Sequence, residues 1–483
     1  MTKYDTQQER DPSNPQRKIV FYELNEVSPN ILKRYVEKFP NSSLAKIYNK
    51  SNYYLTVNTD IGHLSPWVTW PTLHRGVNNR VHNISDLGQN LTMVNKTYPN
   101  YFDILARNKI TVGVFGSLQS YPIPDELSNY SFYIPDTFAS NAETHPKNIE
   151  CFQKLNLYMT SKNGRNVQRS LPILEIFNFL KDSLHIGITL KTFQEIIIQL
   201  IKESLNNHLI IRRRTTQAQL SFDIFYNLLS IKKPSLATFF TNHVASSMHR
   251  YWPAAFPNDY RSFRMPPEWI QKYKDEIWHT MHAADYHINK LLKFIQNNPD
   301  YSLAISSSMG QGPVQESTKI SNQLLLTSPN KFFEFLGIPK EVWSQHLAMA
   351  PQYVFTFQSN QHLNNFKSLI DNFSFRSENL HCYVIDDLSI QLSFGHENCK
   401  DNESITYKNT PVDMKTLGLE IVDIQDETGS YAYHIPEGIL LIFNGSNKQI
   451  NSINIKTTNI APSLLKHFDV SIPEYMGEAY PLF

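Results

Sequence analysis

The stretch from Ser65 to His82, SPWVTWPTLHRGVNNRVH, holds the residue types best suited to chemistry. Thr69 stands directly before Trp70 and Pro71, and Thr72 supplies a second hydroxyl one residue later. Because Pro71 disfavours a helical backbone at Trp70, we expect Thr69 and Trp70 to be extended or in a turn, just before a helix. Helix N-termini attract anions, so a Thr placed there suits a phosphate. The alternative is that Thr69 only caps that helix.

The order Thr-Trp-Pro, then Gly76, then His82 resembles the nucleophile segment of the alkaline phosphatase superfamily, in particular its type I phosphodiesterase and nucleotide pyrophosphatase branch. The resemblance implies that Thr69 is a covalent nucleophile. Thr72 is the neighbouring rival, and we expect it to contact the substrate.

A first metal-binding motif of that superfamily corresponds to Lys18–Leu24, an apolar run that predicts a buried strand. Ligand-binding groups of α/β sheets follow the carboxyl ends of parallel strands. The resemblance implies an Asp at this strand end, where Asn25 stands instead; Glu23 and Glu26 would reach the position only with a shift of register. Asn brings no charge to a dication, so we expect Asn25 to contact the substrate.

Three histidines match, or lie close to, the positions that hold one metal in the superfamily. The predicted strand Pro234–Thr241 leads into Asn242 and His243, near the place of a missing Asp, and His249 follows. His434 lies in Tyr-His-Ile-Pro-Glu-Gly, before the strand-like Ile439–Phe443. Since neutral imidazole is a good zinc ligand, we predict one zinc ion held by His243 (or Asn242), His249 and His434.

A second metal site of the superfamily is predicted to be lost. The strand-like run Tyr301–Ser306 should lead into an Asp-His pair, but Ser308 and Met309 occupy those two positions. A hydroxyl and a thioether are poor ligands for a hard dication. We therefore expect at most one metal per chain, with Ser308 contacting the substrate.

The composition is that of an ordinary globular protein: 483 residues, 41% hydrophobic and 18% charged, with a net charge of +1. This charge gives no reason to expect a nucleic acid or an anionic membrane as partner. The three cysteines are widely spaced and give no disulfide framework. The polar N-terminus lacks a secretory apolar segment, and no apolar run is long enough to span a membrane. We expect a cytoplasmic protein; the sequence does not indicate an oligomeric state.

The order of strands and helices predicts an α/β protein, with an alkaline-phosphatase-like doubly wound, mostly parallel sheet and helices on both faces. We expect a flexible tail at 1–17, a core at 18–144, 233–349 and 426–483, a helical cap at 145–232 and an extra lobe at 350–425. In the cap, residues at helical spacing should form one face: Ile196, Ile197, Leu200, Ile201 and Leu205. His396, in a polar loop of the lobe, is a candidate for lining the substrate pocket.

Three functions are compatible with these residues. The first is a hydrolase or transferase acting on a small-molecule or glycan-linked phosphate ester, phosphodiester or related ester, through Thr69 and one metal or none. The second is a binding or scaffold protein that kept the fold and lost the chemistry. The third is a metal-independent group transferase with His as base. We favour the first, because Thr69, His249 and His434 are all present.

Overall fold

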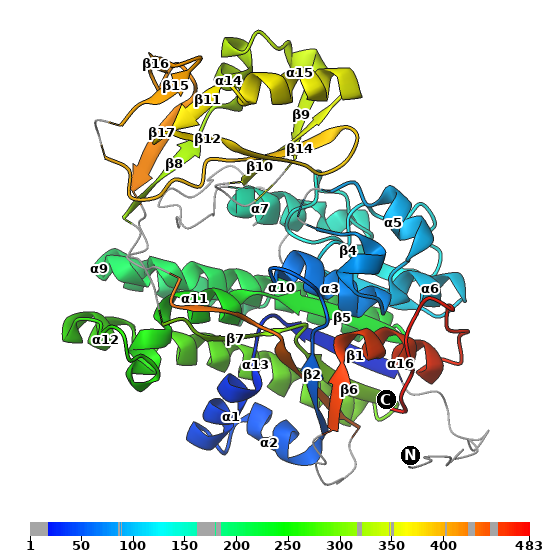
Figure 1. Ribbon diagram of the computed structural model, residues 1–483. Helices are drawn as coiled ribbons and strands as arrows, with labels where there is room; N and C mark the ends of the chain where they lie inside the picture. Colours follow the sequence, from blue (N-terminus) through cyan, green and yellow to red (C-terminus); the bar gives the residue numbers. More distant parts are fainter. Residues whose placement is uncertain are drawn as a thin grey trace, which may run out of the picture.

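The computed structural model describes residues 18–85, 87, 89–161, 179, 185–315, 321–346, 348, 352–400, 403–423, 430–444 and 453–483. The predicted tail at 1–17 and two parts of the predicted cap, 162–178 and 180–184, lie outside the described residues. At the centre is an eight-stranded sheet of order β20-β2-β19-β6-β1-β5-β3-β4 (Figure 1). Its strands are β1 (Lys18–Leu24), β2 (Asn52–Val57), β3 (Val112–Phe115), β4 (Tyr130–Ile134), β5 (Leu236–Thr241), β6 (Tyr301–Ser306), β19 (Glu437–Phe443) and β20 (Ile453–Lys456).

The predicted mostly parallel sheet is confirmed. β1 lies between β5 and β6 and pairs parallel with both, while β19 runs antiparallel to β6 and β2. Six of the seven residues of β1 are buried, as expected for an apolar strand covered on both faces. The carboxyl ends of β1, β5 and β6 therefore meet at one edge of the sheet.

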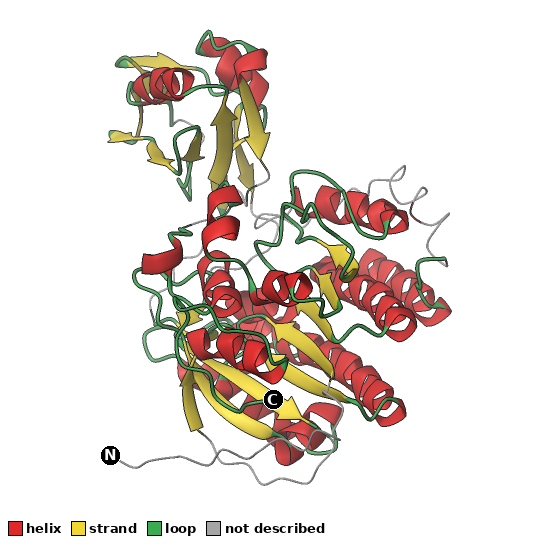
Figure 2. Ribbon diagram, turned by 90° about the vertical axis from the view of Figure 1, so that its right-hand side faces the viewer, coloured by secondary structure: helices red, strands yellow, loops and turns green. Residues whose placement is uncertain are grey.

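Helices cover both faces of this sheet (Figure 2). One face packs against α1 (Pro29–Lys38), α2 (Ser43–Lys50), α10 (Arg213–Lys232), α11 (His243–Ala255) and α13 (Glu276–Asn297). The other packs against α3 (Pro66–Arg75), α6 (Tyr101–Arg107) and α16 (Ile460–His467). Alternate side chains of β1 enter the two cores, because Val20 and Tyr22 belong to the first cluster and Ile19 and Phe21 to the second. The doubly wound architecture is thus the predicted one.

The Thr69 segment differs from the prediction, because Thr69 and Trp70 lie inside helix α3 and are not extended. The helix begins one turn earlier, with Pro66 in its first turn, so Thr69 is not its cap. Pro71 lies within the helix and cannot donate to the carbonyl of Trp67. That carbonyl instead accepts a hydrogen bond from Gln119 Nε2 at 3.3 Å, which compensates for the missing donor.

An upper lobe is inserted between β7 (Gly310–Pro313) and β18 (Ala432–Ile435), which pair antiparallel at the core (Figure 1). It contains two four-stranded sheets, of order β13-β14-β10-β9 and β12-β11-β15-β16. Its strands are β9 (Trp343–His346), β10 (Gln352–Phe357), β11 (Phe373–Phe375), β12 (Glu378–Asn379), β13 (His381–Val384), β14 (Ser389–Ser393), β15 (Ile405–Tyr407) and β16 (Thr410–Val412). With α14 (Pro329–Phe335) and α15 (Asn360–Ile370) they enclose a separate hydrophobic core.

The described part of the predicted cap consists of α7 (Glu150–Ser161), α9 (Leu190–Leu205) and α10. The apolar residues of α9 share a face, but that face does not pack inward: Ile197, Leu200, Ile201 and Leu205 are exposed. Helical spacing shows which residues lie together and not what covers them. Across the described residues, we find no helix with the length and hydropathy needed to cross a membrane.

Candidate metal centre

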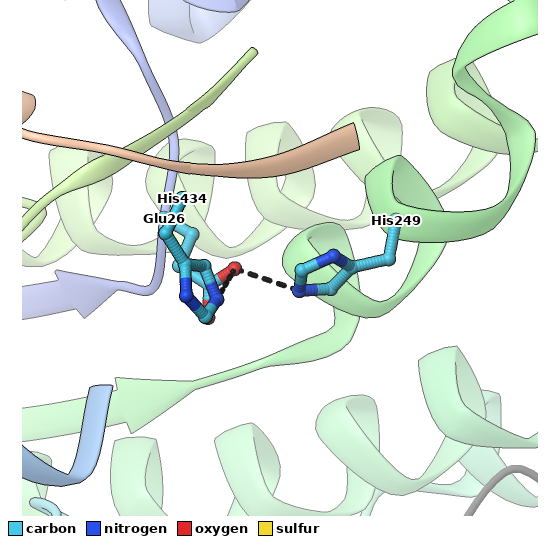
Figure 3. Close-up of side chains that lie close together, drawn as sticks. All are labelled: Glu26, His249 and His434. Atoms are coloured by element: carbon cyan, nitrogen blue, oxygen red, sulfur yellow. Dashed lines mark ion pairs between the residues drawn. The ribbon is translucent and has the colours of Figure 1, made fainter. Parts of the chain in front are cut away.

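Glu26, His249 and His434 converge at the edge of the sheet where β1 ends (Figure 3). Glu26 follows β1 in a left-handed conformation, with φ of 60°, which turns its carboxylate away from the strand direction. Glu26 Oε2 lies 3.0 Å from His249 Nε2, on helix α11, and 3.4 Å from His434 Nε2, on strand β18. The three side chains thus come from three separate parts of the sequence.

Backbone carbonyl groups fix the orientation of both imidazoles. His249 Nδ1 lies 2.7 Å from the carbonyl oxygen of Ala432, and His434 Nδ1 lies 2.6 Å from that of Leu64. A carbonyl oxygen only accepts, so each Nδ1 carries the hydrogen. Both Nε2 atoms therefore face Glu26 and are available as ligands whenever the rings are neutral, an arrangement usual for metal-binding histidines.

Two amide side chains complete the surroundings of the Glu26 carboxylate. Asn25 Nδ2 donates to Oε1 at 2.8 Å, and Gln311 Nε2 donates to Oε2. Gln311 is opposite His434 in the β7–β18 pair, which explains why both reach the same oxygen. Gln311 is fully buried and its Oε1 has no hydrogen-bond partner, so an acceptor oxygen is left free beside the carboxylate.

Opposite charges determine the protonation of this cluster. Burial alone would raise the pKa of Glu26, but the facing imidazoles of His434 and His249 hold it well below its ordinary value. Burial would likewise lower the pKa of His434, whereas the Glu26 carboxylate and the Leu64 carbonyl raise it. Without a metal, the Glu26 carboxylate therefore favours the protonated form of His434.

The donor set suits a divalent metal. Two imidazole nitrogens and one carboxylate oxygen lie within 4.8 Å of one another. Two His and one Glu are a ligand set of catalytic zinc sites, which leave a fourth position open. The His249 side chain is 22% exposed, so the centre is reachable from solvent on that side.

His243 lies apart from this cluster. It is the first residue of α11, and six residues along a helix place it about 120° around the axis from His249. His243 Nδ1 lies 2.7 Å from Thr241 Oγ1 and Nε2 lies 3.1 Å from the carbonyl oxygen of Thr280. Burial lowers its pKa to about 4, which is the behaviour of a neutral core histidine. Glu26 occupies the third position that the sequence had suggested for His243 or Asn242.

Asn25, Thr69 and Ser308, three more of the predicted site residues, form hydrogen bonds with uncharged side chains. Asn25 accepts from the indole N–H of Trp70 at 2.8 Å and donates to Asn242 Oδ1 at 2.7 Å. Thr69 Oγ1 lies 2.8 Å from Ser308 Oγ, and both side chains are fully buried. Asn25 thus joins the Thr69 helix, the start of α11 and Glu26.

Thr72 belongs to a separate chain of hydrogen bonds. The backbone N–H of Ile84 donates to His82 Nδ1 at 2.9 Å, so the hydrogen of the neutral ring is on Nε2. His82 Nε2 donates to Thr72 Oγ1 at 2.9 Å, and that hydroxyl donates to Asp60 Oδ1 at 2.6 Å. Burial, assisted by the charge of Arg75, lowers the pKa of His82 to about 3. His82 therefore cannot accept the Thr72 proton, and this buried hydroxyl holds the loop that carries Asp60.

His396 lies in the upper lobe, where its ring packs 4.6 Å from that of Phe375. The structure thus places this predicted pocket residue within the packing of the lobe. Gln311 was not identified from the sequence, and Glu26 was considered only with a shift of register. A carboxylate directly after a buried strand was the available signal for Glu26, but the turn that aims it depends on the three-dimensional structure.

Comparisons with known proteins find similarity only at the level of solved structures. No protein-family model matches the sequence, and no curated protein matches it. Among solved structures, the chain is similar to human ectonucleotide pyrophosphatase/phosphodiesterase 5, at 10% identity and a TM-score of 0.42, with 95% of this chain and 96% of that chain covered. It is also similar to phosphonoacetate hydrolase from Sinorhizobium meliloti, at 10% identity, a TM-score of 0.41 and coverage of 93% and 95%. A mutant of the alkaline phosphatase PafA gives 12% identity, a TM-score of 0.45 and coverage of 96% and 98%.

Proposed function

We propose that this protein is a hydrolase or transferase acting on phosphate esters, with one zinc ion at Glu26, His249 and His434 and with Thr69 as nucleophile. The observation that carries the proposal is the convergence of two imidazole Nε2 atoms and one carboxylate at an edge of the sheet. Bound there, zinc would supply a Lewis acid for a phosphoryl oxygen.

Charge favours a phosphodiester over a phosphomonoester as substrate. In the described part of the chain, the groups bonded to Glu26 are two imidazoles and two amides, with no Lys or Arg among them. A dication with one carboxylate leaves a net charge of about +1, which a monoanionic diester balances and a dianionic monoester exceeds. Asn25, Ser308 and Met309 supply no second cation site.

Among the described residues, no strong base forms a hydrogen bond with the Thr69 hydroxyl. Its Oγ1 shares a hydrogen bond with Ser308 Oγ, a neutral group. Because the side chain is fully buried, a substrate must open this contact before Thr69 can attack. The same burial favours a second route, in which water attacks the ester at the Glu26 centre and Thr69 only shapes the site.

Hydrolysis of bis(p-nitrophenyl) phosphate and p-nitrophenyl phosphate by zinc-loaded protein tests the proposal. We expect the diester to be hydrolysed faster, Thr69→Ala to lose about 1,000-fold or more in kcat and Thr69→Ser to keep part of the activity. Circular dichroism of each variant controls for folding. Equal rates in wild type and Thr69→Ala would remove Thr69 from the mechanism.

The scaffold alternative makes a different prediction for the same assay. If the neutral residues at positions 25, 308 and 309 mark a protein that lost its chemistry, neither ester is hydrolysed by the zinc-loaded wild type. We further propose a reducing compartment such as the cytoplasm, because Cys382 and Cys399 form no disulfide among the described residues.

A further inference from the structure

A second cavity lies beside the edge strand β4, away from the candidate metal centre (Figure 1). Its volume is about 720 Å³, within the range of about 300–1,000 Å³ that is typical of small-molecule sites. Its walls are α5 (Thr92–Thr97), α6, β4 and the loop 116–129 that joins β3 to β4. Because β5 and β3 separate β4 from β1, three strand spacings, or about 14 Å, lie between this cavity and the strand that leads to Glu26.

Buried polar side chains form the floor of the cavity. Asn100, Tyr130 and Tyr133 line it, and each is at most 4% exposed. The Tyr130 hydroxyl donates to Asp103 Oδ1 at 2.5 Å, and the Tyr133 hydroxyl donates to the carbonyl oxygen of Ser120 at 2.6 Å. Since burying such groups beneath an apolar molecule is costly, this floor suits a polar ligand.

The wall formed by helices is cationic. Lys96 of α5 and Arg107 of α6 line the cavity, together with one carboxylate, that of Asp103. Behind this wall, Arg75 is fully buried and donates to Asn95 Oδ1 at 2.7 Å and to a backbone carbonyl oxygen, two uncharged acceptors. Burial lowers the pKa of Arg75 to about 10, so its guanidinium stays charged at neutral pH. Three cations and one carboxylate thus give this side a net charge of +2.

The wall formed by the loop is anionic. It contributes two carboxylates, Asp125 and Glu126, and among its described lining residues there is no Lys or Arg. Within the part of the chain that the structure describes, no ion pair joins these carboxylates to Lys96 or Arg107, although all four residues line one cavity. The cavity therefore separates a side of net charge +2 from a side of net charge −2.

We propose that this cavity binds a small zwitterion, with an acid group toward Lys96 and Arg107 and an amino group toward Asp125 and Glu126. A ligand with charge of one sign only would be repelled by one of the two walls. A cavity of this volume is about 9 Å across, which is the length of about three extended residues. A zwitterion of tripeptide size therefore reaches both walls. This site depends neither on zinc nor on Thr69.

Nuclear magnetic resonance titration of the full-length protein with triglycine tests the proposal. We expect a dissociation constant of about 1 mM or tighter, as for a compact ligand of this size. N-acetyltriglycine has lost the amino charge and triglycinamide has lost the carboxylate, so each should bind about fivefold or more weakly. Failure of triglycine to bind would overturn the proposal, as would equal or tighter binding of either blocked peptide.

Two variants test which wall holds which end of the ligand. Lys96→Ala should weaken triglycine and N-acetyltriglycine by about threefold or more and leave triglycinamide unchanged, because that peptide has no carboxylate. Asp125→Ala should weaken triglycine and triglycinamide and leave N-acetyltriglycine unchanged. Both side chains are exposed, so neither change removes a buried contact.

The matched control for these variants is Lys33→Ala, an exposed change on α1 that should alter the binding of none of the three peptides. A loss in Lys96→Ala that is equal for all three peptides would contradict a contact between Lys96 and the acid group. An equal loss for all three in Asp125→Ala would likewise contradict a contact between Asp125 and the amino group.

Discussion

At the scale of single residues, the Glu26 carboxylate has two roles in our proposal: ion-pair partner of His434 in the metal-free protein and ligand of the proposed metal. His249 and His434 present their Nε2 atoms to it because Nδ1 of each ring is held by a backbone carbonyl. In the first state His434 is protonated, and in the second it must be neutral. The two states therefore respond to pH in opposite directions.

The metal-free protein should lose stability as the pH rises above about 6.5, the ordinary pKa of His. The folded-state pKa of His434 is raised, so its contribution is complete below the unfolded pKa and is lost as the pH rises through the folded value. The lowered pKa of Glu26 acts at the acid end, where stability is lost as the pH falls through its folded value. Urea unfolding at a series of pH values measures this dependence.

The control for this pH dependence is Glu26→Gln, which removes the partner that raises the pKa of His434. The variant should have a flatter stability profile above about pH 6.5. Saturating zinc should reverse the trend in the wild type, since deprotonated His434 binds the metal. Parallel profiles of metal-free wild type and Glu26→Gln would show that this ion pair does not form.

At the scale of elements, the loop between β2 and α3 positions the centre without supplying a ligand. Asp60 Oδ1 accepts from the Thr72 hydroxyl at 2.6 Å and from the backbone N–H of Asn79 at 2.8 Å. Four residues later, the Leu64 carbonyl holds His434 Nδ1. Asp60 thus fixes the loop that orients a proposed metal ligand.

Asp60→Ala should weaken zinc binding by about tenfold while leaving the stoichiometry at saturation unchanged. The reason is that the Leu64 carbonyl would lose its fixed position, and partners that orient ligands contribute about 10- to 100-fold to metal affinity. Competition with a chromogenic chelator measures the dissociation constant. Asp413→Ala, an exposed change in the upper lobe, is the control; equal effects of the two variants would remove Asp60 from the support of the centre.

Much of the element structure could be predicted from the sequence, and the exceptions have physical causes. β1 and β6 have the predicted bounds, because each is an uninterrupted buried run. The apolar spacing of residues 266–297 is typical of one continuous helix, but the structure interrupts it at Lys274 and Asp275, between α12 (Pro267–Tyr273) and α13. The helical conformation of Thr69 and Trp70 was not predicted. The preference of a residue before Pro for an extended backbone is a local rule, and it takes no account of the hydrogen bond from Gln119 that replaces the missing donor to the Trp67 carbonyl.

At the scale of the whole molecule, the core and the upper lobe have separate hydrophobic clusters and are joined near the candidate centre. The chain leaves the core after β7 and returns in β18, the two strands that place Gln311 opposite His434. Any ligand that shifts the lobe would therefore act on the strands that hold the centre.

The candidate site shows the limit of sequence reasoning most clearly. His249 and His434 meet although they are far apart in the chain, and matching them to known motifs was sufficient to find both. The choice between His243 and Glu26 depends on two features outside any motif. One is the helical state of residues 243–249, which turns His243 away; the other is the left-handed turn at Glu26.

Zinc stoichiometry is the measurement that tests the central claim most directly. Purified protein saturated with zinc and then desalted should carry one equivalent by elemental analysis, and Glu26→Gln should carry none. His243→Asn should keep the metal, because the structure holds His243 away from the centre. Two equivalents in the wild type, retention of zinc by Glu26→Gln, or loss of zinc from a folded His243→Asn would contradict a single centre built from Glu26, His249 and His434.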